Sequence, residues 1–386
     1  SARWSDLFRS VQLGADYRHL AAKDLEFFYG APTVQAAPQG NLGSSTYGRA
    51  QQTFAGLFAQ LHINPLDELE VTLSGRYDGW RNSDRLNTRT TAAGVTSGGT
   101  IEDSRKSAFD PSVALRFEAT REIALRAAAY KSFRAPGFNN TTRTFGAATP
   151  TIANPALEPE NLRGWEAGAD FTGGALTAGF TWFRYDIKNQ IATFRVNSFA
   201  TAPEVVRTIC AAGGGANLTN CGGSANFYTN DQDGRSSGVE ITAAWKLSGD
   251  LRADLAYTRT DSKLVRRGAV VTDPVGVQLV GVPKNLGTLG LTWKAADVLR
   301  VYAEARYIGS MSIDTTSVAN TVFSQGSIMV YGASARYDWN RQVSLAIGVV
   351  NLGDRAYSEN GYTFNQPFNR TLSQPRTANA SVTVRF

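Results

Sequence analysis

The chain has 386 residues, of which 42% are hydrophobic and 11% aromatic, and its 39 basic and 33 acidic side chains leave a formal net charge of +6. No run approaches the roughly 18 uninterrupted apolar residues of a membrane helix, which excludes helical membrane spans. No dense Lys/Arg run is present, so the charge pattern argues against nucleic-acid binding.

Alternation of apolar and polar side chains recurs along the whole chain. Residues 69–78, LEVTLSGRYD, alternate one by one, which is the pattern of a half-buried strand. Each such segment is about long enough to cross a bilayer as a tilted strand. About fourteen strands are predicted in this way: 9–20, 50–63, 69–81, 107–118, 122–132, 161–171, 175–188, 236–247, 251–262, 285–294, 298–309, 327–339, 342–351 and 375–386.

The connections between these segments alternate strictly between short and long. The short ones are tight turns such as SGD at 248–250. Outer-membrane barrels place short turns on the periplasmic side and long loops outside, whereas a soluble sandwich has no reason to do so. The sequence therefore predicts an all-β, antiparallel transmembrane barrel in the outer membrane of a Gram-negative cell, with a periplasmic C-terminus. The long loops are predicted at 21–49, 82–106, 133–160, 189–235, 263–284, 310–326 and 352–374.

The polar face of the predicted strands carries many charges, often as opposite-sign pairs two positions apart. A charge at the bilayer midplane costs about 2–4 kcal/mol, so these side chains cannot face hydrocarbon. They fit a wide, wet lumen or one filled by a polar partner. The charged residues are Asp16, Arg18, Glu70, Arg76, Arg116, Glu118, Glu166, Asp170, Glu240, Lys246, Arg252, Asp254, Arg300, Glu304, Arg306 and Arg336.

The two cysteines lie in one Gly-rich stretch, CAAGGGANLTNC. A pair as close and flexible as Cys210 and Cys221 predicts a loop disulfide and an oxidising compartment, although two free thiols remain the alternative. The two histidines, His19 and His62, are predicted at opposite membrane edges, so they cannot share a triad or a metal. No catalytic set or cofactor motif stands out, and we do not expect an enzyme.

One segment invites a calcium interpretation. Residues 230–240, NDQDGRSSGVE, place Asp231 and Asp233 at the spacing of an EF-hand loop. The closing Glu of such a loop is missing. Gly234 stands where the loop needs a third ligand, and Arg235 stands where it needs its invariant glycine. We therefore interpret the segment as a turn before a strand and predict no metal site.

Several motifs, in order, resemble the TonB-dependent outer-membrane receptors. They are YKSFRAPGFNN at 130–140, NPALEPENLRGWEAGADF at 154–171, GVPKNLGTLGLTW, VVNLGDRAY and the terminal aromatic strand. The resemblance implies the C-terminal part of a 22-strand barrel, with the plug, the first strands and the TonB-engaging segment absent from these residues. It also implies partnership with TonB and its inner-membrane energising complex, and import of a scarce ligand. A ferric siderophore is the commonest class, followed by cobalamin and saccharides.

The ligand site is predicted among loops at the extracellular mouth. Aromatic rings stack on flat or chelated ligands, and Arg pairs with carboxylates. For any single residue, a packed loop or an interface position is the competing interpretation. The candidates are Phe133, Arg134, Phe138, Asn139, Arg143, Phe145, Tyr362, Phe364, Asn365, Phe368 and Arg370.

The C-terminal run, TANASVTVRF, alternates up to the last residue. We expect Phe386 at the inner aromatic girdle, together with Tyr337 and Trp339 at the interface. By resemblance, a terminal aromatic marks a barrel for the barrel assembly machinery. We also expect contact with outer-membrane lipid and lipopolysaccharide.

Two other functions stay open on the sequence. A passive, porin-like diffusion channel would need a constriction loop with clustered charges, but the longest predicted loop, 189–235, is rich in Gly and Ala. A purely structural or assembly barrel would bind no small ligand.

Overall fold

The computed structural model describes residues 8–29, 42–146, 151–196, 204, 225–268, 274–314, 323–363 and 370–385. Within them, fourteen strands pair antiparallel, each with its neighbours along the chain, in one sheet. They are β1 (Phe8–Tyr29), β2 (Leu42–Leu66), β3 (Leu69–Thr91), β5 (Ser104–Glu118), β6 (Ile123–Arg134), β8 (Glu160–Gly173), β9 (Leu176–Val196), β10 (Ala225–Lys246), β11 (Leu251–Arg267), β12 (Asn285–Ala296), β13 (Leu299–Ile308), β16 (Ile328–Asp338), β17 (Val343–Val350) and β20 (Thr377–Val384).

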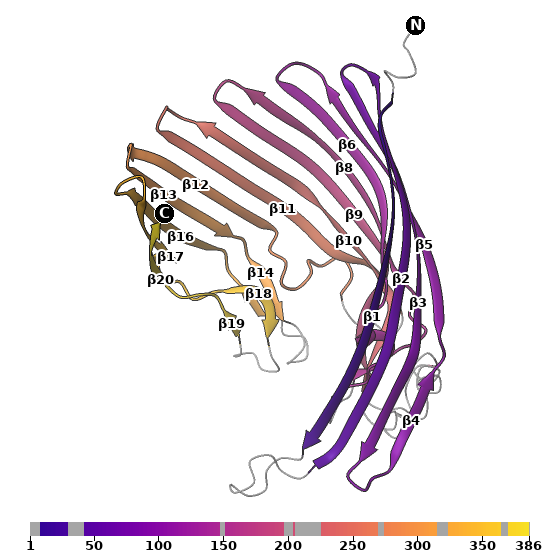
Figure 1. The fold of residues 1–386 in the computed structure, drawn as a ribbon. Coiled ribbons are helices and arrows are strands. Elements are labelled where there is room, and N and C mark those ends of the chain that lie inside the picture. Colours follow the sequence, from indigo (N-terminus) through magenta and orange to yellow (C-terminus); the bar gives the residue numbers. More distant parts are fainter. Residues whose placement is uncertain are drawn as a thin grey trace, which may run out of the picture.

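The sheet curls into an open trough (Figure 1). In the described part of the chain its order begins at β1 and ends at β20. Short turns join the strands along one rim, and the long connections lie at the other (Figure 1). Those connections carry short elements: β4 (Thr96–Ile101), α2 (Phe138–Thr141), β7 (Thr151–Ile152), β14 (Met311–Asp314), β15 (Phe323–Gln325), β18 (Ser358–Thr363) and β19 (Arg370–Leu372). No helix among the described residues is long and apolar enough to cross a bilayer.

The alternation therefore predicted the strands correctly: all fourteen are present, in order. Their lengths were wrong at the long-loop rim, where β1, β2 and β3 reach 22, 25 and 23 residues. Large parts of the predicted loops 21–49, 82–106 and 189–235 are strand. Only about 9–11 residues are needed to cross a bilayer. Beyond that length the outward face of β2 and β3 turns mostly polar, as at Arg49 and Asp84, which form an ion pair of 2.9 Å, whereas β1 still exposes Leu25 and Phe27 there. The backbone hydrogen bonds between β2 and β3 continue there, although the alternation of apolar and polar residues has stopped.

The two faces of the trough differ sharply. The convex face exposes large apolar side chains: Leu13 is 76% exposed, Leu57 64% and Ile347 63%. The other face carries the predicted charges, several joined two positions apart on one strand. Examples are Arg76–Asp78 at 2.5 Å and Arg252–Asp254 at 2.6 Å. An apolar outer band around a charged interior is the arrangement of a membrane barrel wall.

Close backbone packing makes some glycines of the sheet irreplaceable. A Cβ added to Gly238 of β10 would lie 2.0 Å from the carbonyl oxygen of Arg259 and 2.8 Å from the ring of Phe183. We expect Gly238→Ala to force β10 and β11 apart and to cost about 1–3 kcal/mol, because packed sites absorb extra atoms poorly. Urea unfolding of the intact protein in detergent measures this cost.

Gly79→Ala in β3 is the matched control, because nothing lies within 4 Å of its added Cβ. Its unfolding midpoint should stay within error of the parent protein. Equal midpoints for the two variants would contradict the close approach of β10 to β11.

Candidate functional site

The described parts of the connection between β6 and β8, residues 135–146 and 151–159, fold back onto the sheet. Its β7 pairs with the start of β10, where Thr151 lies opposite Asn226 and Ile152 opposite Phe227. Ile152 and Phe227 are each 1% exposed. The connection also contacts β1 through Arg143 and β3 through Thr141 and Thr142. A segment that reaches β1, β3 and β10 together must lie on the concave side of the trough. We call it the inner loop.

Arg85 of β3 anchors the inner loop to the concave side of the sheet. Its guanidinium is 2% exposed and donates to the carbonyl of Thr141 at 2.6 Å, the hydroxyl of Thr142 at 3.3 Å and the carbonyl of Glu102 at 2.7 Å. Burial lowers the pKa of Arg85. Thr141 and Thr142 are themselves buried. The loop is thus a packed part of the structure near α2.

A second arginine joins the inner loop to the first strand. Arg143 donates through Nε to Asp24 at 2.7 Å and through Nη2 to Glu26, both on β1. Its guanidinium also lies 4.6 Å above the ring of Phe145. These contacts join residues more than a hundred positions apart in sequence. They place the loop across the concave side of β1 to β3.

A pocket of about 510 Å³ opens beside the inner loop on the concave face. Two of its walls are rings, Phe54 and Phe133, which flank the buried indole of Trp80. The ring centroids of Trp80 and Phe133 are 4.9 Å apart and nearly parallel, and those of Phe54 and Trp80 are 6.4 Å apart. Arg18 lies 4.5 Å above the ring of Phe54. The lining residues are Asp16, Arg18, Gln52, Phe54, Arg76, Asp78, Asp110, Ser132, Phe133, Arg134 and Ala135.

The floor of this pocket is an ion-pair network. Arg76 donates to Asp16 at 2.7 and 3.1 Å and to Asp78 at 2.6 and 2.5 Å. Asp110 lies beside it, and its buried Oδ1 atom has no hydrogen-bond partner among the described residues. The pocket thus combines ring faces, guanidinium groups and one unsatisfied carboxylate oxygen. It can stack a flat group and bind polar atoms at the rim of that group.

Arg134 stands between this pocket and a second one of about 580 Å³, which Asn140, Thr193 and Tyr228 also line. It forms an ion pair with Glu160, which is 9% exposed and also accepts the amide of Ile191 at 2.7 Å. The Arg134 side chain is 69% exposed. Glu160 therefore holds one side of the Arg134 guanidinium, and the other side is open to a ligand.

The structure brings part of the predicted site together. Phe133 and Arg134 line the first pocket. Asn139 accepts a hydrogen bond from Arg143 at 3.4 Å, Phe138 packs towards Gly48, and Phe145 pairs with Thr151 through the backbone. These residues serve the packing of the inner loop, whichever further role they have.

The remaining predicted residues belong to the other end of the chain. Tyr362 lies in β18 and Arg370 in β19, where the structure describes only the backbone. Phe364, Asn365 and Phe368 lie outside the described residues, as do Cys210, Cys221 and Phe386. The second ligand-binding group, the disulfide and the assembly signal stay predictions.

Sequence reasoning missed Arg18, Phe54 and Trp80. A signal was present, because Phe54 and Trp80 are large rings on the polar side of the alternation, where charges prevail. Such rings have no lipid to face, so they need either a neighbour or a ligand. Asp231 and Asp233 were wrongly placed in a turn, since both lie within β10.

The family model described as TonB dependent receptor-like, beta-barrel matches residues 2–352. The iron-regulated outer membrane virulence protein of Vibrio cholerae serotype O1 is 25% identical over 236 residues, which cover 60% of this chain and 33% of that protein. The metal-pseudopaline receptor CntO of Pseudomonas aeruginosa is 25% identical over 334 residues, which cover 81% of this chain and 40% of that protein.

Solved structures share the fold. The crystal structure of the ferric-catecholate import receptor Fiu from K12 E. coli matches with a TM-score of 0.71 and 17% sequence identity, over 97% of this chain and 52% of that chain. The chain thus spans between about a third and about half of the length of these three proteins.

Proposed function

Because the chain belongs to the family of TonB-dependent receptor β-barrels, we propose that it forms much of the wall of an outer-membrane receptor that imports a metal chelate. The family is one of transport receptors rather than enzymes. Relatives described as iron-regulated, as a metal-pseudopaline receptor and as a ferric-catecholate receptor support a chelate as the cargo. A ferric siderophore is the favoured case.

The observation that carries this proposal is the ring-walled pocket beside the inner loop. A chelating ligand presents flat, conjugated groups around its metal, and Phe133 offers a ring for stacking, while the buried ring of Phe54 closes the wall beneath Arg18. Arg18 and Arg134 would pair with oxygen atoms of the chelator, as guanidinium groups do with carboxylates and other anionic oxygens. The metal is cargo here, held by its chelator and not by protein ligands.

The proposed transport step follows the family. TonB and its inner-membrane complex would act on a plug supplied by the whole receptor, and the ligand would leave the pocket when the plug moves. The contribution of this chain is the wall: it excludes lipid, presents the pocket and keeps the inner loop in place. The long-loop rim would face the outside and the short turns the periplasm.

Uptake of radiolabelled iron by iron-starved cells tests the proposal. The intact gene is expressed in cells that lack their own chelate receptors, and ⁵⁵Fe is supplied as a catecholate, a hydroxamate or an aminocarboxylate chelate. We expect saturable uptake of one of these that disappears in cells without TonB. Uptake that persists without TonB, together with steady nonselective conductance in planar bilayers, would replace this account with a passive channel.

A further inference from the structure

A group of basic side chains stands on the convex face of β9, β10 and β11, just beyond the apolar band. Trp165 of β8 and Trp182 of β9 face outwards there and are 39% and 41% exposed. On the same face of β9, the next outward positions towards the long-loop rim are Arg184, Asp186 and Lys188. Rings of this kind lie at the level of lipid headgroups. The basic side chains therefore begin at the level where the hydrocarbon core of the membrane ends.

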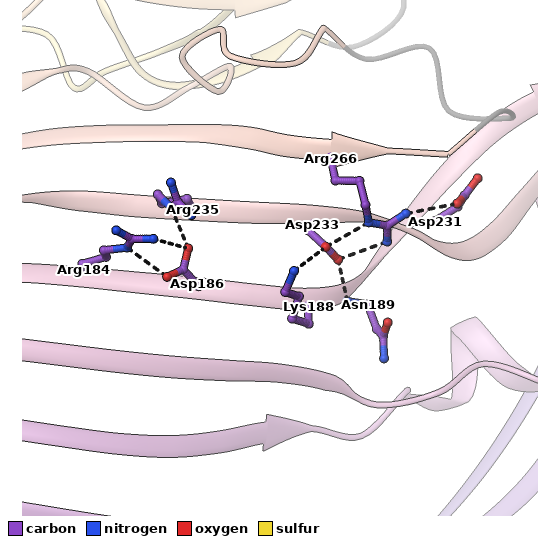
Figure 2. A network of polar contacts seen from close by, with 8 residues as sticks. All are labelled: Arg184, Asp186, Lys188, Asn189, Asp231, Asp233, Arg235 and Arg266. Atoms are coloured by element: carbon purple, nitrogen blue, oxygen red, sulfur yellow. Dashed lines mark hydrogen bonds and ion pairs between the residues drawn. The ribbon is translucent and has the colours of Figure 1, made fainter.

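The basic side chains surround two carboxylates (Figure 2). Asp186 accepts Nε of Arg184 at 2.9 Å and Nε of Arg235 at 2.6 Å. Asp233 accepts Nζ of Lys188 at 2.9 Å and the guanidinium of Arg266 at 2.9 and 3.1 Å. We call Arg184, Lys188, Arg235 and Arg266 the outer basic cluster.

The local backbone explains how the cluster forms. Asn189 has a φ of 56°, a left-handed conformation that asparagine tolerates, and the β9–β10 register shifts beside it. This shift brings Lys188 and the amide of Asn189 to the Asp233 carboxylate, the amide at 3.2 Å. Burial alone would raise the pKa of Asp233, but the hydrogen bonds from Arg266, Lys188 and Asn189 outweigh it and lower the pKa to about 2. The carboxylate therefore stays ionised and holds the cations at any physiological pH.

The carboxylates are covered and the cations are not. The Asp233 side chain is 4% exposed, whereas Lys188 is 61% and Arg266 48% exposed. Asp231, 3.7 Å from Arg266, is the third carboxylate here. Arg235 donates only through Nε to a described residue, so its Nη groups have no acceptor in the described part of the chain. The carboxylates therefore use only part of the donor capacity of these cations, and Lys188 and Arg266 stay open to solvent.

More basic residues continue the cluster sideways. In the strand register, exposed Arg163 of β8 lies opposite Asp186, and Lys131 of β6 lies opposite Arg163. Lys263 of β11 lies opposite Arg235, but it is itself paired with Asp261 at 2.7 Å. At about 4.8 Å between strands, the span from β8 to β11 is about 14 Å. That width suits a headgroup with more than one phosphate better than a single small anion.

We propose that the outer basic cluster binds the phosphate groups of lipopolysaccharide in the outer leaflet. This rests on the proposed function, because that function turns the long-loop rim outwards. Arginine is suited to phosphate, which it binds through two donors at once, and lysine adds a point charge. The acyl chains would then lie along the apolar band below Trp165 and Trp182. Asp186 and Asp233 keep the cations in place, and both carboxylates are more covered than the cations that they hold.

Lipopolysaccharide retained by the intact receptor tests this proposal. Lys188→Gln combined with Arg235→Gln removes one exposed and one half-buried cation, while Arg184 and Arg266 still neutralise the two carboxylates. The receptor is purified from outer membranes in mild detergent and its bound lipopolysaccharide is quantified by mass spectrometry. We expect about a tenfold loss in the double variant and retention in Lys188→Arg. Arg252→Gln, an exposed arginine of the concave face, is the matched control and should change nothing.

Two further measurements identify which ligand the cluster binds. Purified lipopolysaccharide added to delipidated receptor should raise its thermal midpoint, and dephosphorylated lipopolysaccharide should not. Inorganic phosphate that reproduces the whole shift would overturn the assignment to a lipid, and equal retention by the double variant would overturn the site. Chelate uptake per surface copy should be unchanged in the double variant. A receptor that retains lipopolysaccharide but imports no chelate would refute only the proposed function.

Discussion

Replacing Arg85 by methionine should loosen the inner loop and lower the free energy of unfolding by about 3 kcal/mol. Arg85 makes three hydrogen bonds, and the two buried ones reach Thr141 and Thr142 of the loop. Hydrogen bonds from a charged donor contribute about 1.5–3 kcal/mol each, and the Thr141 carbonyl left behind is buried without this donor. The relief from burying a charge offsets part of the loss. Urea unfolding of the intact protein measures the total, and limited proteolysis between residues 138 and 157 measures the local loosening.

Arg81→Met is the matched control on the same strand. Arg81 is 48% exposed and pairs with Asp103 at 2.5 Å, which is an exposed contact worth about 0–1 kcal/mol. Its variant should unfold and be cleaved almost as the parent protein is. If Arg85→Met were no more sensitive to protease than Arg81→Met, the inner loop would not depend on this anchor.

Replacing Phe133 by alanine should weaken binding of the imported chelate about tenfold. Phe133 lines the pocket and stacks on Trp80, and it is less buried than Phe54, the other ring of the wall. An aromatic pair contributes about 0.5–1.5 kcal/mol beyond the area it buries, and the ligand would lose the ring face itself. Titration of the purified receptor with the chelate found by the uptake assay gives the dissociation constant.

Two variants separate stacking from folding. Phe133→Tyr keeps the ring and should bind within about twofold of the parent. Phe109→Ala removes a ring of the convex face, 55% exposed, and should leave the dissociation constant unchanged. Equal affinities for Phe133→Ala and Phe109→Ala would exclude Phe133 from the binding surface.

The order of the strands could be predicted because each one faces two different surroundings. Lipid on one side and a charged interior on the other impose an alternation that local sequence records, as in 69–78. The end of β1 still alternates, with Leu25 and Phe27 exposed on the outward face next to Asp24 and Glu26, and that signal was missed. Beyond the bilayer the outward positions of β2 and β3 are mostly polar, so the local pattern there does not distinguish their extended ends from loops. The predicted bounds failed there for that reason.

The inner loop and its anchors could not be predicted by the same reasoning. Asp84 has a φ of 49° and lies at a register shift between β2 and β3. The extra residue changes which positions face inwards, so that Arg85 and Asn87 reach the loop, with Asn87 3.0 Å from the hydroxyl of Thr144. If the alternation of inward and outward positions continued unbroken from Leu69, Arg85 would face outwards. The contact of Arg143 with Asp24 spans 119 positions, a separation at which no local pattern exists.

The most direct test of the account is to locate the cargo metal in the intact receptor. Crystals grown with the imported ferric chelate would be measured at the iron absorption edge. The account predicts one anomalous peak on the concave side beside the inner loop, with the chelator in contact with Phe133 and Arg134. A peak found only elsewhere, with this pocket empty in the presence of saturating chelate, would contradict it.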